Sequence, residues 1–235
     1  MEQVEIEPWG RLLWNDRDAW FENTSPISIE RREEIESGLL VALQYFVGGG
    51  FMLHASCISY EGRAIALVGR SRAGKSTLAA IMAQQGCSLV SDGVTLFEPS
   101  TLGLRNGRRL CKLSDESIAQ LGLSADEFPY VTEDRIKRYV TAPGPPPPDG
   151  LNLSEAFVIA DGDTDEIQSL TPTEQVLALI SNGIYTSRLP PKSARLQWER
   201  AVQAVQNGLL VHRLVRRKKW ENIPSLVSIL FERLR

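Results

Sequence analysis

The 235-residue sequence has few residues that could bind a transition metal or form disulfide bonds. It contains two histidines and three cysteines, Cys57, Cys87 and Cys111, and no Cys-x-x-Cys pair. The sequence therefore contains no set of Cys and His residues with the spacing of a zinc site. We expect the three cysteines to be buried free thiols, because unpaired cysteine is among the most buried residue types.

The sequence also lacks a long apolar run and an excess of one charge. Its longest apolar segment, residues 38–47, is about half of the roughly 18 residues that a membrane span requires. Lys and Arg number 26 against 29 Asp and Glu, so the strong basic excess of general nucleic-acid binders is missing. The first ten residues have no secretory-signal pattern. These absences predict a cytoplasmic protein that engages neither a membrane nor a nucleic acid.

Strand-like and helical patterns alternate along the chain, which predicts an α/β fold. A short strand at 4–7 and an indole-rich segment come first, and a helix after Ser28 ends at the glycines 48–50. We treat 1–50 as a segment packed on a main domain at 51–235. The main domain is predicted to contain strands at 51–60, 64–69, 87–91, 94–98, 135–142, 155–160 and 209–215, and helices at 75–85, 114–123, 171–184, 192–207 and from 224 onward.

One motif carries most of the chemistry. Residues 69–76 read G-R-S-R-A-G-K-S and match the phosphate-binding loop G-x-x-x-x-G-K-[ST] between an apolar strand and a helix. Backbone N–H groups of such a loop surround phosphate oxygens, its lysine reaches the β and γ phosphates, and its serine ligates Mg²⁺. The expected ATP- and Mg²⁺-binding set is Gly69, Arg70, Ser71, Arg72, Ala73, Gly74, Lys75, Ser76 and Thr77.

Asp92 ends the predicted strand that follows the loop's helix, 17 positions beyond Lys75. An aspartate on a neighbouring strand end can accept the proton of an attacking hydroxyl or hold the Mg²⁺ together with Ser76. A turn or helix-capping aspartate is the structural alternative. The pairing of the loop with Asp92 predicts phosphoryl transfer.

Residues 53–96 resemble the catalytic domain of HPr kinase/phosphorylase and its smaller kinase relatives. The shared features are His54 on the first strand of a hairpin, the phosphate loop, the sequence Gln-Gln-Gly ending the helix, and Asp92 ending the next strand. The resemblance implies a PEP carboxykinase-type fold with a mixed central sheet flanked by helices. It also implies that Asp92 is the base activating a substrate serine, with His54 beside it. A hydrogen-bonded core residue is an equally good interpretation of His54.

The sequence departs from that family in ways that favour a kinase without phosphorolysis. Arg72 replaces the middle glycine of the loop, Gly93 stands where a second acidic residue often follows the aspartate, and the glycine-rich phosphorolysis signature is missing. The resemblance extends to kinases that phosphorylate ribosomally made peptides, including a C-terminal serine of lasso peptide precursors. The implied partner is therefore a serine-containing peptide or small protein. Since the family's kinases form rings, segment 1–50 is either core packing or a homo-oligomer contact.

Two groups of basic residues have less specific interpretations. Lys137 and Arg138 could neutralise a transferring phosphate, or could be solvated strand charges. The basic run 212–219 could dock an acidic peptide, although a solvated strand end is the simpler interpretation. Two other functions stay open at this point: a small-molecule P-loop kinase, and a nucleotide sensor without turnover, which the changes at Arg72 and Gly93 suggest.

Overall fold

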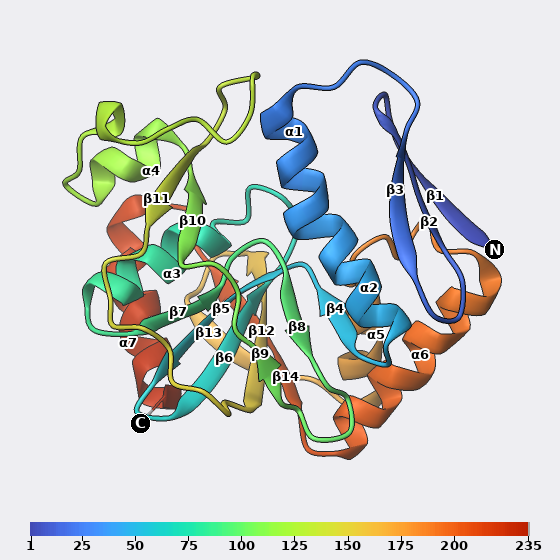
Figure 1. Ribbon diagram of the computed structural model, residues 1–235. Coiled ribbons are helices and arrows are strands. Elements are labelled where there is room, and N and C mark those ends of the chain that lie inside the picture. The colour runs from blue at the N-terminus through green and yellow to red at the C-terminus, as the bar shows by residue number, and fades with distance from the viewer. Residues whose placement is uncertain (235) are drawn as a thin grey trace.

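The computed structural model describes residues 1–234 and is built around a six-stranded mixed sheet (Figure 1). The strand order is β13 (Glu166–Ser169), β14 (Leu210–Arg216), β12 (Leu153–Asp161), β6 (Arg63–Val68), β5 (Ala55–Tyr60) and β7 (Ser88–Ser91). Strands β14, β12 and β6 are parallel, whereas β13 and β5 are antiparallel to their neighbours. Because β7 is antiparallel to β5, it runs in the same direction as β6. The expectation of an α/β fold with a mixed central sheet is confirmed.

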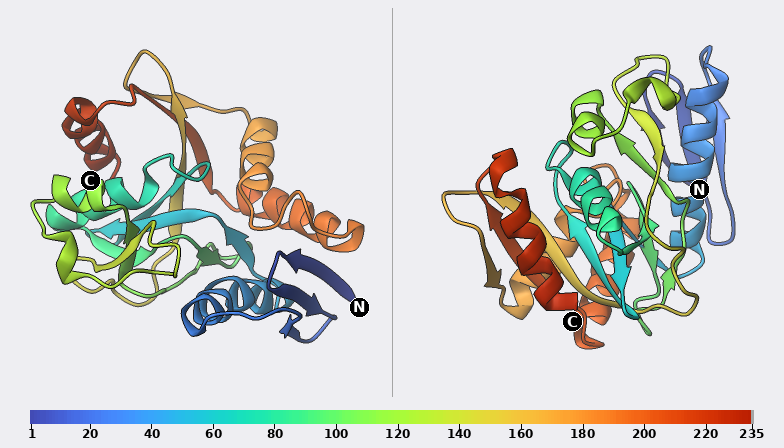
Figure 2. Two further views of the ribbon diagram at one scale, coloured as in Figure 1. Left: turned by 90° about the horizontal axis from the view of Figure 1, so that it is seen from above. Right: turned by 90° about the vertical axis from the view of Figure 1, so that its left-hand side faces the viewer.

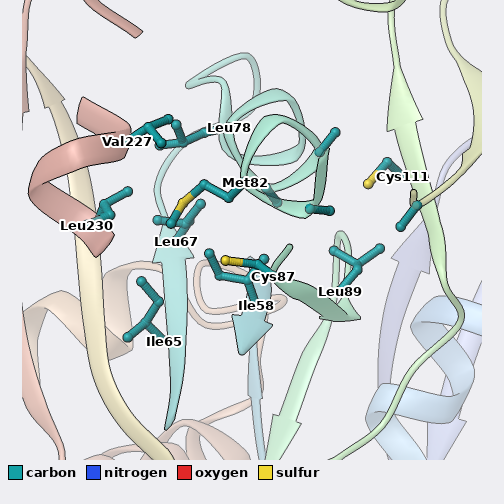
Figure 3. Packing of buried hydrophobic residues seen from close by; sticks show 14 of the residues in the cluster. Ile58, Ile65, Leu67, Leu78, Met82, Cys87, Leu89, Cys111, Val227 and Leu230 are labelled. Carbon is teal, nitrogen blue, oxygen red and sulfur yellow. The ribbon is translucent and has the colours of Figure 1, made fainter. Parts of the chain in front are cut away.

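Helices cover both faces of this sheet (Figure 2). Helices α3 (Lys75–Gln84) and α7 (Ile223–Leu234) lie on one face, and α5 (Pro172–Ser181) and α6 (Pro191–Gln206) on the other. Side chains of β6 alternate between the faces, as a strand requires. Ile65 and Leu67 pack toward α3 and α7, close to Met82 and Leu230 (Figure 3), while the smaller alanines of β6 face α5 and α6.

The N-terminal segment forms a separate antiparallel sheet, β1 (Glu2–Ile6), β2 (Gly10–Trp14) and β3 (Ala19–Asn23). The sequence predicted only one strand here, because the tryptophans hide the alternation of buried and exposed positions. A continuous helical segment follows, made of α1 (Ile29–Glu34), a π-helical stretch (Ile35–Leu40) and α2 (Val41–Val47). This segment buries its apolar side chains against the sheet and against Met52, Leu96 and Ile184.

The predicted strand 51–60 is wrong as a single element. It breaks at His54 into β4 (Phe51–Leu53) and β5, which belong to different sheets. Strand β4 pairs with β8 (Thr95–Phe97), which pairs with β9 (Leu104–Arg105). The break follows from a change of hydrogen-bonding partner, since the His54 N–H donates to the carbonyl of Asn182 (2.9 Å).

A two-stranded ribbon, β10 (Leu110–Leu113) and β11 (Arg138–Thr141), stands beside the main sheet with α4 (Asp115–Gln120) and a short 3-10 turn (Ala125–Glu127). A second 3-10 turn, Trp220–Asn222, leads into α7. The strand expected at 135–142 therefore begins three residues later, at Arg138, and the helix expected at 171–184 ends at Ser181.

Two smaller expectations are confirmed. All three cysteines are free and buried. Thr171 and Glu174 form the capping box that begins α5. Within residues 1–234, the helices are too short or too polar to cross a membrane.

Candidate functional site

Three chain segments with predicted site residues meet at one edge of the main sheet. The phosphate loop follows the carboxyl end of β6, and Asp92 follows the carboxyl end of β7. Strand β5 lies between them in the opposite direction, so its first residue is at this same edge, and His54 directly precedes it. Ligands of open α/β sheets bind at the carboxyl ends of strands. The mixed topology thus brings together residues separated by as many as 38 positions, from His54 to Asp92.

The phosphate loop passes directly into α3, whose N-cap is Gly74. Gly74 has a φ of 83°, in the left-handed region where a residue with a Cβ is strained. The Lys75 side chain folds back inside the loop, and its Nζ donates to the carbonyls of Gly69 (2.8 Å) and Arg70 (3.1 Å). The loop therefore surrounds the ammonium group, and free N–H groups of the first α3 turn stand beside it.

Arg72, the residue that replaces the family's middle glycine, has a φ of 66°. This conformation is costly for a residue with a side chain, by about 1 kcal/mol. The loop therefore keeps the backbone shape that a glycine would favour, with an arginine in its place. The side chain lines the cavity described below, so the substitution adds a positive charge to the site.

The Asp92 carboxylate is held from two other strands. Its Oδ1 accepts a hydrogen bond from the Ser56 hydroxyl on β5 (2.5 Å), and its Oδ2 accepts one from the backbone N–H of Lys112 on β10 (2.9 Å). Neither bond is a helix cap. Each carboxylate oxygen still has a second lone pair, so the group can also accept a proton or bind a cation.

Gly93 occupies the position where HPr kinase-like enzymes often have a second acidic residue, and its φ is 81°. A Cβ at this position would meet no atom within 4 Å, so space does not require glycine. The backbone conformation does, because residues with side chains rarely adopt it. The missing second acid thus coincides with a turn that favours glycine.

Burial alters the ionisation of His54 and Lys75, two basic groups that interact with Asp92. Burial lowers the pKa of His54 to about 4, and the positive charge of Lys75 lowers it further against the opposing effect of Asp92. His54 is therefore neutral at physiological pH. Burial also lowers the pKa of Lys75 to about 8, again opposed by Asp92. Lys75 keeps its charge at neutral pH and loses it in moderately alkaline solution.

These residues open into one large cavity of about 1510 Å³. Its lining includes ten basic side chains and four acidic ones, although the whole chain has a net charge of −3. A concentration of positive charge in a concave site attracts anions. The basic residues are Arg31, Arg72, Lys75, Arg105, Arg108, Lys112, Lys137, Arg216, Lys218 and Lys219, and the acidic ones are Glu34, Asp92, Glu116 and Asp134.

Most of the predicted site residues line this cavity, and a few do not. From the loop, Ser71, Arg72, Gly74, Lys75, Ser76 and Thr77 line it, whereas Gly69, Arg70 and Ala73 are outside the lining. His54, Asp92 and Lys137 also line it.

Arg138 is directed elsewhere, although it is next to Lys137. Its guanidinium donates to Asp115 (2.8 Å), to the carbonyl of Phe128 (2.8 Å) and to the hydroxyl of Tyr130 (2.7 Å). Through these contacts the Arg138 guanidinium joins α4 to the β10–β11 ribbon. The structure does not bring Arg138 to the cavity.

Sequence reasoning missed the two residues that hold Asp92 and gave no role at the phosphate loop to two cavity residues near the C-terminal end of the chain. Ser56 and Lys112 hold Asp92. Arg216 ends β14, and Trp220 follows it on the next turn; both line the cavity. Arg216 belongs to the basic run 212–219, for which the sequence left peptide docking or a solvated strand end open, and Lys218 and Lys219 of that run also line the cavity. Ser56 is two positions after His54, so a strand period of two could have indicated it. No local pattern could have placed Lys112, Arg216 and Trp220 at this site, because they reach it through strand order.

The donor set at the site suits Mg²⁺ better than a soft metal. No cluster of three or more His, Cys, Asp or Glu side chains that could hold a metal occurs within residues 1–234. The Ser76 hydroxyl and the Asp92 carboxylate are hard oxygen donors that line one cavity. Mg²⁺ in phosphoryl-transfer sites commonly takes one or two protein oxygens and completes its shell with phosphates and water. The residues therefore fit the ion.

Comparison with known proteins adds little. No family model matches the sequence, and no curated protein matches it. Among solved structures, the Hpr(Ser) kinase/phosphatase from Coxiella burnetii aligns with 77% of this chain and 95% of its own, with a TM-score of 0.40 and 9% sequence identity. A likeness of this degree carries no conclusion about activity, which has to be argued from the site.

Proposed function

We propose that this protein is an ATP- and Mg²⁺-dependent kinase that transfers the γ-phosphoryl group to a serine hydroxyl of a peptide or small protein. The observation that carries the proposal is the convergence of the phosphate loop, His54 and Asp92 on one positively charged cavity. Positioning and charge neutralisation are the main requirements of phosphoryl transfer. The sequence resemblance of residues 53–96 to HPr kinase-like enzymes points in the same direction.

Each residue has a specific role in this proposal. The loop from Gly69 to Thr77 binds the phosphates through backbone N–H groups, and Lys75 neutralises the β and γ oxygens. Ser76 and Asp92 would hold the Mg²⁺, which neutralises phosphate charge when bound. Asp92 accepts the proton of the serine hydroxyl. His54 is neutral, so it interacts with Asp92 without adding a charge of its own to the site.

The size of the cavity supports a second substrate larger than a metabolite. Small-molecule pockets commonly measure roughly 300–1,000 Å³, whereas this cavity measures about 1510 Å³. Its lining also includes apolar residues of the N-terminal segment and of the segments that pack against it. The cavity lining includes the apolar or aromatic residues Trp9, Ile35, Leu39, Val94, Leu96, Tyr139 and Ile184, as well as Arg105 and Arg108. Such a lining suits an extended peptide with apolar and acidic side chains.

The test is mass spectrometry of serine-containing peptides incubated with the protein and Mg-ATP. We expect a mass gain of one phosphoryl group, lost in Asp92→Asn and kept in Asp18→Asn, which changes an exposed aspartate outside the cavity lining. ATP binding without a gain on any peptide would refute the peptide kinase. ADP release with a metabolite acceptor would then favour a small-molecule kinase, and tight binding without turnover would favour a nucleotide sensor.

A further inference from the structure

Arg216, at the end of β14, is directed toward the phosphate loop from a distant part of the chain. Strand β14 is parallel to β12, and β12 is parallel to β6, so all three end at the same edge of the sheet. Arg216 is paired in register with Asp161, the last residue of β12. The site residue therefore comes from the C-terminal part of the chain, outside the region that resembles HPr kinase-like enzymes.

The Arg216 guanidinium packs against Gly74, the glycine that begins α3. A Cβ built on Gly74 would stand 3.4 Å from Nη1 and 3.6 Å from Nη2 of Arg216. Lys75, the next residue, holds its ammonium inside the same loop. Two cations and the N-terminal end of a helix dipole are thus gathered in one place.

This positive charge is only partly compensated. The Arg216 side chain is 9% exposed, and within residues 1–234 its one ion-pair partner is Asp161, whose Oδ1 is 3.5 Å from Nη2. Asp161 is 57% exposed and is shared with Lys218 at 3.6 Å. The Arg216 Nε is buried and has no hydrogen-bond partner in the part of the chain that the structure describes. A buried cation with unused donors is costly unless an anion satisfies it.

We infer that Arg216 is a phosphate-binding residue, whose guanidinium contacts the phosphate chain of the nucleotide above Gly74. The inference rests on the proposed function only in that the loop binds a nucleotide. A guanidinium presents donors in a fork that matches two phosphate oxygens, which a lysine cannot do. Arg216 thus supplies, from β14, a second cation for the phosphates that Lys75 contacts from the loop.

The alternative is a structural role, in which Arg216 serves only to join β14 to β12 through Asp161. The two roles make opposite predictions for the empty protein. Removing a structural ion pair lowers the melting temperature, whereas removing an uncompensated cation leaves it unchanged or raises it. Removing Arg216 weakens phosphate binding if it is an uncompensated cation, and leaves phosphate binding unaffected if it is only part of a structural ion pair.

The experiment compares the wild type with Arg216→Gln, Arg216→Lys and Arg213→Gln, each titrated with Mg-ATP and with inorganic tripolyphosphate. Arg213 is the matched control, because it is exposed on the same strand and outside the cavity lining. We expect Arg216→Gln to weaken both ligands about 10- to 100-fold, Arg216→Lys to recover part of the loss, and Arg213→Gln to bind normally. Without ligand, Arg216→Gln should melt at or above the wild-type temperature.

A lower melting temperature with unchanged affinity in Arg216→Gln would overturn the inference, and so would equal losses in Arg216→Gln and Arg213→Gln. A wild type that binds neither ligand would overturn both this inference and the proposed function. A wild type that binds ATP but transfers no phosphoryl group would overturn the kinase alone, and loss of that binding in Arg216→Gln would still support the role of Arg216.

Discussion

The Ser56 hydroxyl donates a hydrogen bond of 2.5 Å to Oδ1 of Asp92 and so joins β5 to the end of β7. The bond restricts the carboxylate rotation that the loop after β7 would otherwise permit. The second oxygen is held by the Lys112 N–H, so the carboxylate plane is fixed from two sides. A base that is fixed before substrate binds needs little reorganisation during the reaction.

Removing this support should slow transfer without preventing nucleotide binding. For Ser56→Ala we expect the turnover rate to fall about tenfold, the value of one hydrogen bond to a charged group, with ATP affinity within about twofold. Ser59→Ala, on the same strand, is the matched control and should keep its rate. Peptide phosphorylation under saturating Mg-ATP measures the effect. An unchanged rate in Ser56→Ala would show that the Asp92 orientation does not depend on Ser56.

Loss of the carboxylate itself should have a much larger effect. For Asp92→Asn we expect transfer to fall about 10²- to 10⁴-fold, the usual contribution of a general base. Nucleotide binding in the absence of Mg²⁺ should change little, because the loop and Lys75 provide the phosphate contacts. Full activity in this variant would remove Asp92 from the mechanism.

The lowered pKa of Lys75 predicts a pH dependence of nucleotide binding. Burial sets this pKa at about 8 in the free protein. A bound phosphate chain favours the charged amine and raises its pKa, so binding takes up protons at pH values near and above 8. We expect affinity to fall as the pH rises above about 8. Calorimetry in buffers of different ionisation enthalpy measures the uptake, and proton release at pH 8.5 would contradict the prediction.

Because the chain has only two histidines, the ionisation of His54 can be followed directly by NMR titration. The folded pKa of His54 is about 4, below its ordinary value of 6.5. The unfolded chain therefore binds more protons between pH 6.5 and 4, and folding stability is lost as the pH falls through that window. His54→Gln should lose less stability between pH 7 and pH 5 than the wild type does. A normal titration of His54 near 6.5 would contradict the buried position.

Arg72 provides a test of backbone strain in the loop. Since Arg72 has a φ of 66°, Arg72→Gly should relieve strain and raise the free energy of unfolding by up to about 1 kcal/mol. The matched variant Arg70→Gly gains flexibility only in the unfolded chain and should lose about 0.5–1 kcal/mol. Urea denaturation distinguishes the two. Equal losses in both variants would mean that the loop does not hold Arg72 in a strained conformation.

The sequence predicted the phosphate loop and Asp92 because each depends on local signals. The loop is a contiguous motif, and Asp92 follows a short apolar strand. It could not predict the position of Arg216, because β14 reaches the site only through its pairing with β12. It also missed the break at His54, since residues 51–60 contain no glycine or proline and give no sign of a change of sheet. Strand order is a property of the whole chain and leaves no mark in a short window.

The N-terminal segment illustrates the same limit. Its apolar and tryptophan-rich sequence predicted either packing on the main domain or an oligomer contact. The spacing of these residues along the chain does not distinguish the two. In the structure Trp14 is buried among the apolar side chains of the N-terminal segment, and Trp9 lines the cavity. The boundary at residue 50 and the oligomeric state stay predictions.

The central claim is that this cavity transfers a phosphoryl group to a serine. The most direct measurement is the intact mass of a serine peptide and of its alanine counterpart after incubation with the protein and Mg-ATP, beside the Asp92→Asn variant. The account predicts a gain of one phosphoryl group on the serine peptide with the wild-type protein alone. An equal gain on the alanine peptide, an equal gain with Asp92→Asn, or ATP binding with no gain on any serine peptide would contradict it.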